Sequence, residues 1–65
     1  MNIKKQKYWI ELCEDKPSSL FWWRIKARNG RIKANSYKIY HKFSLCFNDA
    51  LALADETDLQ LRKER

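Results

Sequence analysis

The chain has 65 residues, a mass of 7.9 kDa and a formal net charge of +6 at pH 7. A chain this short buries only about 60% of its unfolded surface, which provides one small core and a single domain over residues 1–65, and excludes a large catalytic domain. Apolar residues form 45% of the sequence, and Trp, Tyr and Phe each occur three times, so the composition is that of a folded chain and not of a disordered one.

The chain begins with a basic segment, and residues 1–6 are expected to be flexible. Glu11 follows Tyr8 and Trp9 closely and breaks the apolar run before a secretion signal could form. No stretch approaches the roughly 18 apolar residues that a membrane-spanning helix requires. We therefore expect a cytoplasmic protein with no membrane partner.

Two segments alternate with the period of a half-buried β-strand. In residues 7–14, one face carries Tyr8, Ile10 and Leu12, and the other carries Trp9, Glu11 and Cys13. In residues 20–28, one face carries Phe21, Trp23, Ile25 and Ala27, and the other carries Trp22, Arg24, Lys26 and Arg28. The residues between these segments have the Pro, Ser and Asp chemistry of a turn.

Asn29-Gly30 is the sharpest local signal in the sequence. A type I′ turn needs positive φ at both central residues, and this dipeptide adopts that conformation at little cost. The alternation resumes in residues 31–37, with Ile32 and Ala34 expected to face the core. The sequence therefore predicts a β-hairpin here.

From Ser44 onward the period of the apolar residues changes from that of a strand to that of a helix. Residues 44–62 are predicted to form this helix, whose apolar stripe consists of Cys46, Phe47, Ala50, Leu51, Leu53, Ala54 and Leu61. The predicted fold class is α+β: a three-stranded antiparallel sheet followed by one C-terminal helix packed on one face, in the order β-β-β-α.

The middle of the chain is strongly basic. Residues 16–42 contain eight Lys or Arg residues and no Asp or Glu. A surface of one charge sign attracts polyanions. The cations predicted to face an anion, including a nucleic acid, are Arg24, Lys26, Arg28, Arg31 and Lys33.

Strand alternation directs Trp22 and Trp23 to opposite faces, so one indole is left outside the core. Trp9 shares the face of Trp22, and a large exposed aromatic cluster usually marks a contact. One interpretation is a homodimer with Trp9 and Trp22 as interface anchors. A second is nucleic-acid binding, in which indoles stack on bases and cations neutralise phosphates. A third is that Arg and Lys stems cover the indoles and nothing binds.

Catalytic and metal-binding patterns are missing from the sequence. His41 is the only histidine and has no acidic residue near it in the sequence. Cys13 and Cys46 are far apart and are expected to be buried, reduced thiols. A metal site needs more ligands at shorter spacing. We therefore assign no catalytic residue, metal or cofactor, and predict that the chain is not an enzyme.

Residues 21–36 resemble the repeat of the YegP-like small domains. That repeat reads aromatic-x-aromatic-Arg-apolar-x-Ala-x-Asn-Gly, then an apolar pair and a serine. This chain has Phe21-Trp22-Trp23-Arg24-Ile25-Lys26-Ala27-Arg28-Asn29-Gly30, followed by Ile32, Ala34 and Ser36. The resemblance implies a β-β-β-α unit with no assigned enzymatic activity, found as tandem repeats or as homodimers of single repeats. In two departures, Arg31 stands where the family often has an acidic residue, and the usual glycine after the serine is missing.

The expected function is that of a small non-enzymatic interaction module that acts as a homodimer through its aromatic and basic sheet surface. One alternative is a nucleic-acid-binding protein that uses the same face. Another is an accessory protein of a phage or mobile element that binds and inhibits a host protein. The expected partners are a second copy of the chain, a nucleic acid or an acidic protein.

Overall fold

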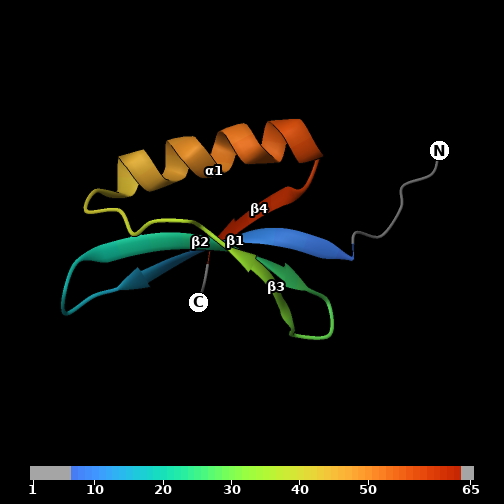
Figure 1. Cartoon of the computed structure of the whole chain (residues 1–65), viewed down its shortest axis with the longest axis horizontal. Helices are drawn as coiled ribbons and strands as arrows, with labels where there is room; N and C mark the ends of the chain where they lie inside the picture. Colours follow the sequence, from blue (N-terminus) through green and yellow to red (C-terminus); the bar gives the residue numbers. More distant parts are fainter. Residues whose placement is uncertain (1–6, 64–65) are drawn as a thin grey trace.

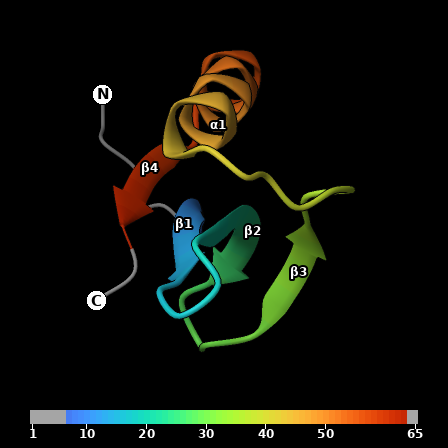
Figure 2. The same cartoon turned by 90° about the vertical axis from the view of Figure 1, so that its left-hand side faces the viewer.

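The structure is a computed structural model that describes residues 7–63. Its elements in chain order are β1 (Tyr8–Asp15), β2 (Leu20–Ala27), β3 (Ile32–Asn35), α1 (Phe43–Thr57) and β4 (Gln60–Lys63). The strands form one sheet of order β3-β2-β1-β4, and α1 lies across one face of that sheet (Figures 1 and 2). The predicted α+β class is confirmed. The expected flexible start, residues 1–6, lies outside the described residues.

β1 and β2 form the centre of the sheet. They pair antiparallel over their full lengths, from Tyr8 opposite Ala27 to Asp15 opposite Leu20. The turn between them is held locally, because the hydroxyl of Ser18 donates a hydrogen bond to the Asp15 carboxylate. This pairing sets the direction of every side chain on the two strands, since neighbours along a strand point to opposite faces.

The hairpin between β2 and β3 is present, but its turn differs from the predicted one. The N–H of Gly30 donates to the carbonyl of Ala27 at 2.9 Å, and the N–H of Ala27 donates to the carbonyl of Arg31 at 2.8 Å, so residues 28–30 form a three-residue loop. Gly30 has a φ of 94°, whereas Asn29 does not have a positive φ. The type I′ prediction is therefore wrong. Asn29 instead accepts a 3.0 Å hydrogen bond from the N–H of Arg31 through Oδ1, which stabilises the longer loop.

The longer loop and a bulge change which residues of β3 face the helix. Ile32 pairs with Lys26 and Ala34 pairs with Ile25, so two steps along β3 match one step along β2. A shift of one residue reverses the direction of a side chain, and Ile32 therefore lies on the side of Lys26, away from the helix. Ile32 is 40% exposed and Ala34 is also exposed, so the prediction that both belong to the core is wrong.

The helix ends at Thr57 and not at residue 62 as predicted. Asp58 ends it with a left-handed backbone of φ 64° and ψ 18°, and its N–H donates to the carbonyl of Ala54 at 2.7 Å. Aspartate is one of the few residues besides glycine that adopt this conformation without a large penalty. The chain can therefore reverse at this point and return to the sheet.

The returning chain forms a fourth strand, which the sequence analysis did not predict. β4 pairs parallel with β1, with Leu61 opposite Ile10. Leu59 and Leu61 pack against the core, and the backbone of β4 pairs with an edge of β1 that would otherwise be exposed. The sheet therefore has four strands instead of the predicted three, and the helix is not the last element.

The core lies between α1 and one face of the sheet. Ile10, Cys46 and Ala50 are completely or almost completely buried, and Tyr40 is 3% exposed. Trp23 packs against this cluster from β2, as strand alternation predicts. Within residues 7–63, no helix is both long and apolar enough to cross a membrane.

Candidate functional site

The sheet face opposite α1 is the candidate site, and we call it the open face. No element within residues 7–63 covers it (Figures 1 and 2). The strand registers assign to it these side chains: Trp9, Glu11 and Cys13 of β1, Trp22, Arg24 and Lys26 of β2, Ile32 and Asn35 of β3, and Gln60 and Arg62 of β4. The open face therefore combines two indoles with three cations and one carboxylate.

Glu11 lies at the centre of the open face and is 8% exposed. Its Oε1 accepts a hydrogen bond from Nε of Arg24 at 2.7 Å, and its Oε2 lies 3.7 Å from Nζ of Lys26. A buried carboxylate needs such partners, because burial without them carries a large desolvation penalty. The pairing neutralises Glu11 and holds Arg24 and Lys26 beside each other on the surface.

Trp9 and Arg62 form a second contact on the same face. The guanidinium carbon of Arg62 lies 4.2 Å from the centroid of the Trp9 ring, within the range of a cation–π interaction. Gln60 accepts hydrogen bonds from Nε and Nη2 of Arg62 at 3.2 and 3.0 Å, which fixes the orientation of the guanidinium. The half-buried Trp9 ring is thus partly covered by a cation from β4.

Trp22 lines a surface hollow of about 260 Å³ where the open face meets the segment after β3. The other lining residues are Asn35, Ser36 and Ile39. The indole is half-buried, and Ile39 is 54% exposed. An aromatic ring, an aliphatic side chain and an amide therefore border one concave space.

The predicted cation set is divided among three places. Arg24 and Lys26 lie on the open face with both predicted anchors, Trp9 and Trp22. Arg28 and Arg31 are exposed at the hairpin loop. The ammonium of Lys33 lies 5.7 Å from the centroid of the Tyr8 ring, and Tyr8 belongs to the strand face that α1 covers. The fold therefore brings together two of the five cations with the indoles.

Two members of this face, Gln60 and Arg62, were not predicted from the sequence. The predicted helix includes Arg62, whose direction would then follow a helical period. The alternation of Leu59 and Leu61 with Gln60 and Arg62 is a signal for a strand. It is too short to outweigh the helical pattern that precedes it.

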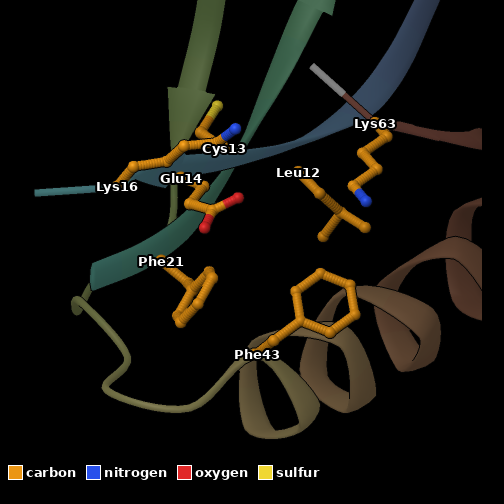
Figure 3. Close-up of a pocket in the computed structure, with 7 residues that line it drawn as sticks. All are labelled: Leu12, Cys13, Glu14, Lys16, Phe21, Phe43 and Lys63. Atoms are coloured by element: carbon orange, nitrogen blue, oxygen red, sulfur yellow. The ribbon is translucent and has the colours of Figure 1, made fainter. Parts of the chain in front are cut away.

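A larger hollow of about 380 Å³ lies on the other side of the sheet, at the start of α1. Figure 3 shows the rings of Phe21 and Phe43 below Leu12, with the carboxylate of Glu14 and the ammonium of Lys63 extending toward them. The two rings meet edge to face, with an angle of 73° between their planes. The Lys63 ammonium lies 5.8 Å from the centroid of the Phe43 ring. Acidic and basic groups therefore share this hollow, in contrast to the open face, where the one carboxylate that residues 7–63 contribute to that face is paired.

Two buried titratable groups of the core, Tyr40 and Cys46, are held in their neutral forms. Burial raises the pKa of Tyr40 to about 12, and the hydrogen bond to Asp49 acts in the same direction. Burial also raises the pKa of the Cys46 thiol, with a further contribution from the charge of Asp49. Both cysteines are buried and no disulfide joins them. Among residues 7–63, the His, Cys, Asp and Glu side chains form no group of three that could hold a metal ion.

Comparisons with protein-family models, with curated proteins and with solved structures found no match for this chain.

Proposed function

We propose that this chain is a small non-enzymatic binding module whose open face binds nucleic acid through its phosphate backbone. The observation that carries the proposal is the pairing of Glu11. The one carboxylate among the described residues of the open face is buried between Arg24 and Lys26. The charge presented to a ligand is therefore positive.

The cations extend across the width of the open face. Arg62 comes from the outer strand β4, Arg24 and Lys26 come from β2, and Arg28 and Arg31 continue the charge onto the hairpin loop. A nucleic-acid backbone carries regularly spaced negative charges, and neutralising them releases counterions, which drives binding. A cationic surface that spans several strands is suited to this kind of ligand.

The aromatic groups of the face favour nucleic acid over a simple polyanion. The Arg62 guanidinium on Trp9 and the indole of Trp22 are flat surfaces of the kind on which bases stack. The cations and these flat groups lie on one face, so a single strand could contact both at once.

Self-association through the open face is the competing proposal, and the homodimer expected from the sequence stays a prediction. Apposing two copies of this face would bring Arg24, Lys26 and Arg62 of one copy against those of the other. Juxtaposed like charges across an interface are unfavourable by several kcal/mol. The charge distribution therefore favours an anionic partner over a second copy.

The test is a tryptophan fluorescence titration with single-stranded DNA at several salt concentrations. We expect quenching, and an affinity that falls with salt with a log–log slope of about −0.7 per phosphate neutralised. The double variant K26Q/R62Q should bind more weakly and with a shallower slope. The double variant K16Q/K42Q removes the same charge away from the open face and should keep the steeper slope.

Two results would overturn the proposal. One is an absence of binding at low salt. The other is a light-scattering mass of twice the 7.9 kDa chain mass that returns to one chain mass in W22A but not in K16Q/K42Q, which would assign the open face to self-association.

A further inference from the structure

We infer that the hollow beside Trp22 is a pocket for one unpaired nucleobase, so that the module binds single strands in preference to duplexes. This inference rests on the proposed function and deepens it by assigning a base-binding group to the same face. It depends on three features of the hollow: its walls, its polar group and the rigidity of its frame.

The walls of the hollow fit a flat aromatic ligand. The Trp22 indole provides a flat surface, and Ile39 provides an aliphatic side chain at the same hollow of about 260 Å³. A base stacks on an aromatic side chain with a sequence-tolerant gain in affinity. Ile39 is 54% exposed, and such an exposed aliphatic group would gain burial when a ring covers it.

Asn35 provides the polar group. Its side chain is exposed and makes no hydrogen bond to another residue of the described chain. The hydroxyl of Ser36, by contrast, already donates a 2.8 Å hydrogen bond to the carbonyl of Lys38. The Asn35 amide carries a donor and an acceptor side by side, the pattern that pairs with the N6 and N7 edge of adenine.

The frame of the hollow is held by hydrogen bonds on both sides. The N–H of Ser36 donates to the carbonyl of Trp23 at 2.7 Å. Four residues later, Tyr40 and Phe21 exchange two backbone hydrogen bonds of 2.7 and 2.8 Å. These bonds fasten both ends of the segment that carries Ile39 to β2, so the pocket exists before the ligand arrives and little ordering is needed on binding.

The position of the hollow links it to the phosphate-binding cations. Asn35 pairs in register with Arg24, and the two side chains therefore share one level of the open face. If a base stacks on Trp22, the sugar-phosphate backbone of its strand would lie at the level of Asn35 and Arg24. A base within a duplex cannot enter, because it would have to leave its stack and its pair.

The test compares two single-stranded octanucleotides with equal numbers of phosphates, oligo(dA) and an abasic oligomer. We expect oligo(dA) to bind about tenfold more tightly, from the stacking of one base. In an NMR titration, the indole N–H signal of Trp22 should shift with oligo(dA) and stay in place with the abasic oligomer and with duplex DNA.

Variants separate the pocket from the charged surface. W22L should remove the affinity difference between oligo(dA) and the abasic oligomer. Because the Asn35 amide pairs with adenine, the wild type should also bind oligo(dA) more tightly than oligo(dT), and N35A should reduce this second difference. F43L removes an exposed aromatic ring on the opposite side of the sheet and should keep both differences. Thermal unfolding of each variant should check that it is folded.

Equal affinities for oligo(dA) and the abasic oligomer, with normal salt dependence, would overturn the base pocket and leave the proposed function standing. Retention of the tenfold difference in a folded W22L variant would also overturn it. Absence of binding to either oligomer would overturn the proposed function itself.

Discussion

The hydroxyl of Tyr40 donates a 2.8 Å hydrogen bond to Oδ2 of Asp49, and this bond joins the segment beside β2 to the helix. Tyr40 is also fastened to Phe21 by two backbone hydrogen bonds. A single buried residue therefore connects the sheet, the segment after β3 and α1. The relationship matters for function, because the same segment carries Ile39 to the hollow beside Trp22.

Replacing Tyr40 by phenylalanine should lower the free energy of unfolding by about 1 kcal/mol, the usual net contribution of one intramolecular hydrogen bond. Asp49 is exposed and can be hydrated after the change, so the loss should not be larger. Urea unfolding followed by circular dichroism measures the effect. Y37F is the matched control, because Tyr37 is 82% exposed. An equal loss in both variants would contradict the assigned role of Tyr40.

The same residue predicts a pH dependence at high pH. The pKa of Tyr40 rises from 10.0 to about 12 on folding, so the folded state holds the proton more tightly than the unfolded state. The stabilising contribution is complete below pH 10, and it is lost as the pH rises from 10 toward about 12. The free energy of unfolding should fall over this range more steeply in the wild type than in Y40F. Identical slopes in the two proteins would contradict the prediction.

Glu11 should be important for stability and should oppose anion binding. The change E11Q removes the charge that pairs with Arg24 and Lys26, and it should destabilise the fold by about 1–3 kcal/mol. It should also raise the affinity for single-stranded DNA, because the open face gains one unit of positive charge. E14Q, on the same strand but exposed, is the control for stability and should have little effect. Unchanged stability in E11Q would contradict the central role of this carboxylate.

Gly30 should tolerate asparagine better than alanine. Its φ of 94° is unfavourable for residues with a side chain, although a Cβ added at this position would meet no atom within 4 Å. The loss in G30A should therefore be backbone strain alone, about 1–2 kcal/mol. G30N should lose less, because asparagine visits positive φ more readily. Equal losses in chemical denaturation would indicate a different loop conformation.

Asp58 should determine whether the chain turns back into β4. D58V places a β-branched residue at φ 64° and should destabilise the fold by about 1–2 kcal/mol, whereas D58G should lose less, because glycine adopts this backbone conformation without strain. Amide hydrogen exchange at Leu61 and Arg62 measures the strand directly, and its protection should fall in D58V. If the helix instead continued through residue 62, position 58 would not need a left-handed backbone. D58V would then leave both the stability and the amide protection unchanged, which would contradict the prediction.

Alternation along β1 and β2 could be predicted from the sequence, because a period of two residues sets the side of every residue in a strand whatever lies beside it. The separation of Trp22 from Trp23 follows from it, as does the presence of Trp9 beside Trp22 on one face. The helical stripe of Cys46 and Ala50 was predictable for the same reason, since a local period determines which side is buried.

The membership of the open face depended on pairings between distant segments, which a local pattern does not contain. Loop length in the hairpin moved Ile32 to the side of Lys26, because one extra residue shifts the register. Leu61 fits both a helical stripe and a strand. It lies in a strand because the backbone groups at one edge of β1 have no other strand within residues 7–63 to pair with. That parallel pairing is what places Arg62 over Trp9. The sequence by itself therefore determined the two indoles and the basic character of the surface, whereas the tertiary structure decided which cations lie beside those indoles.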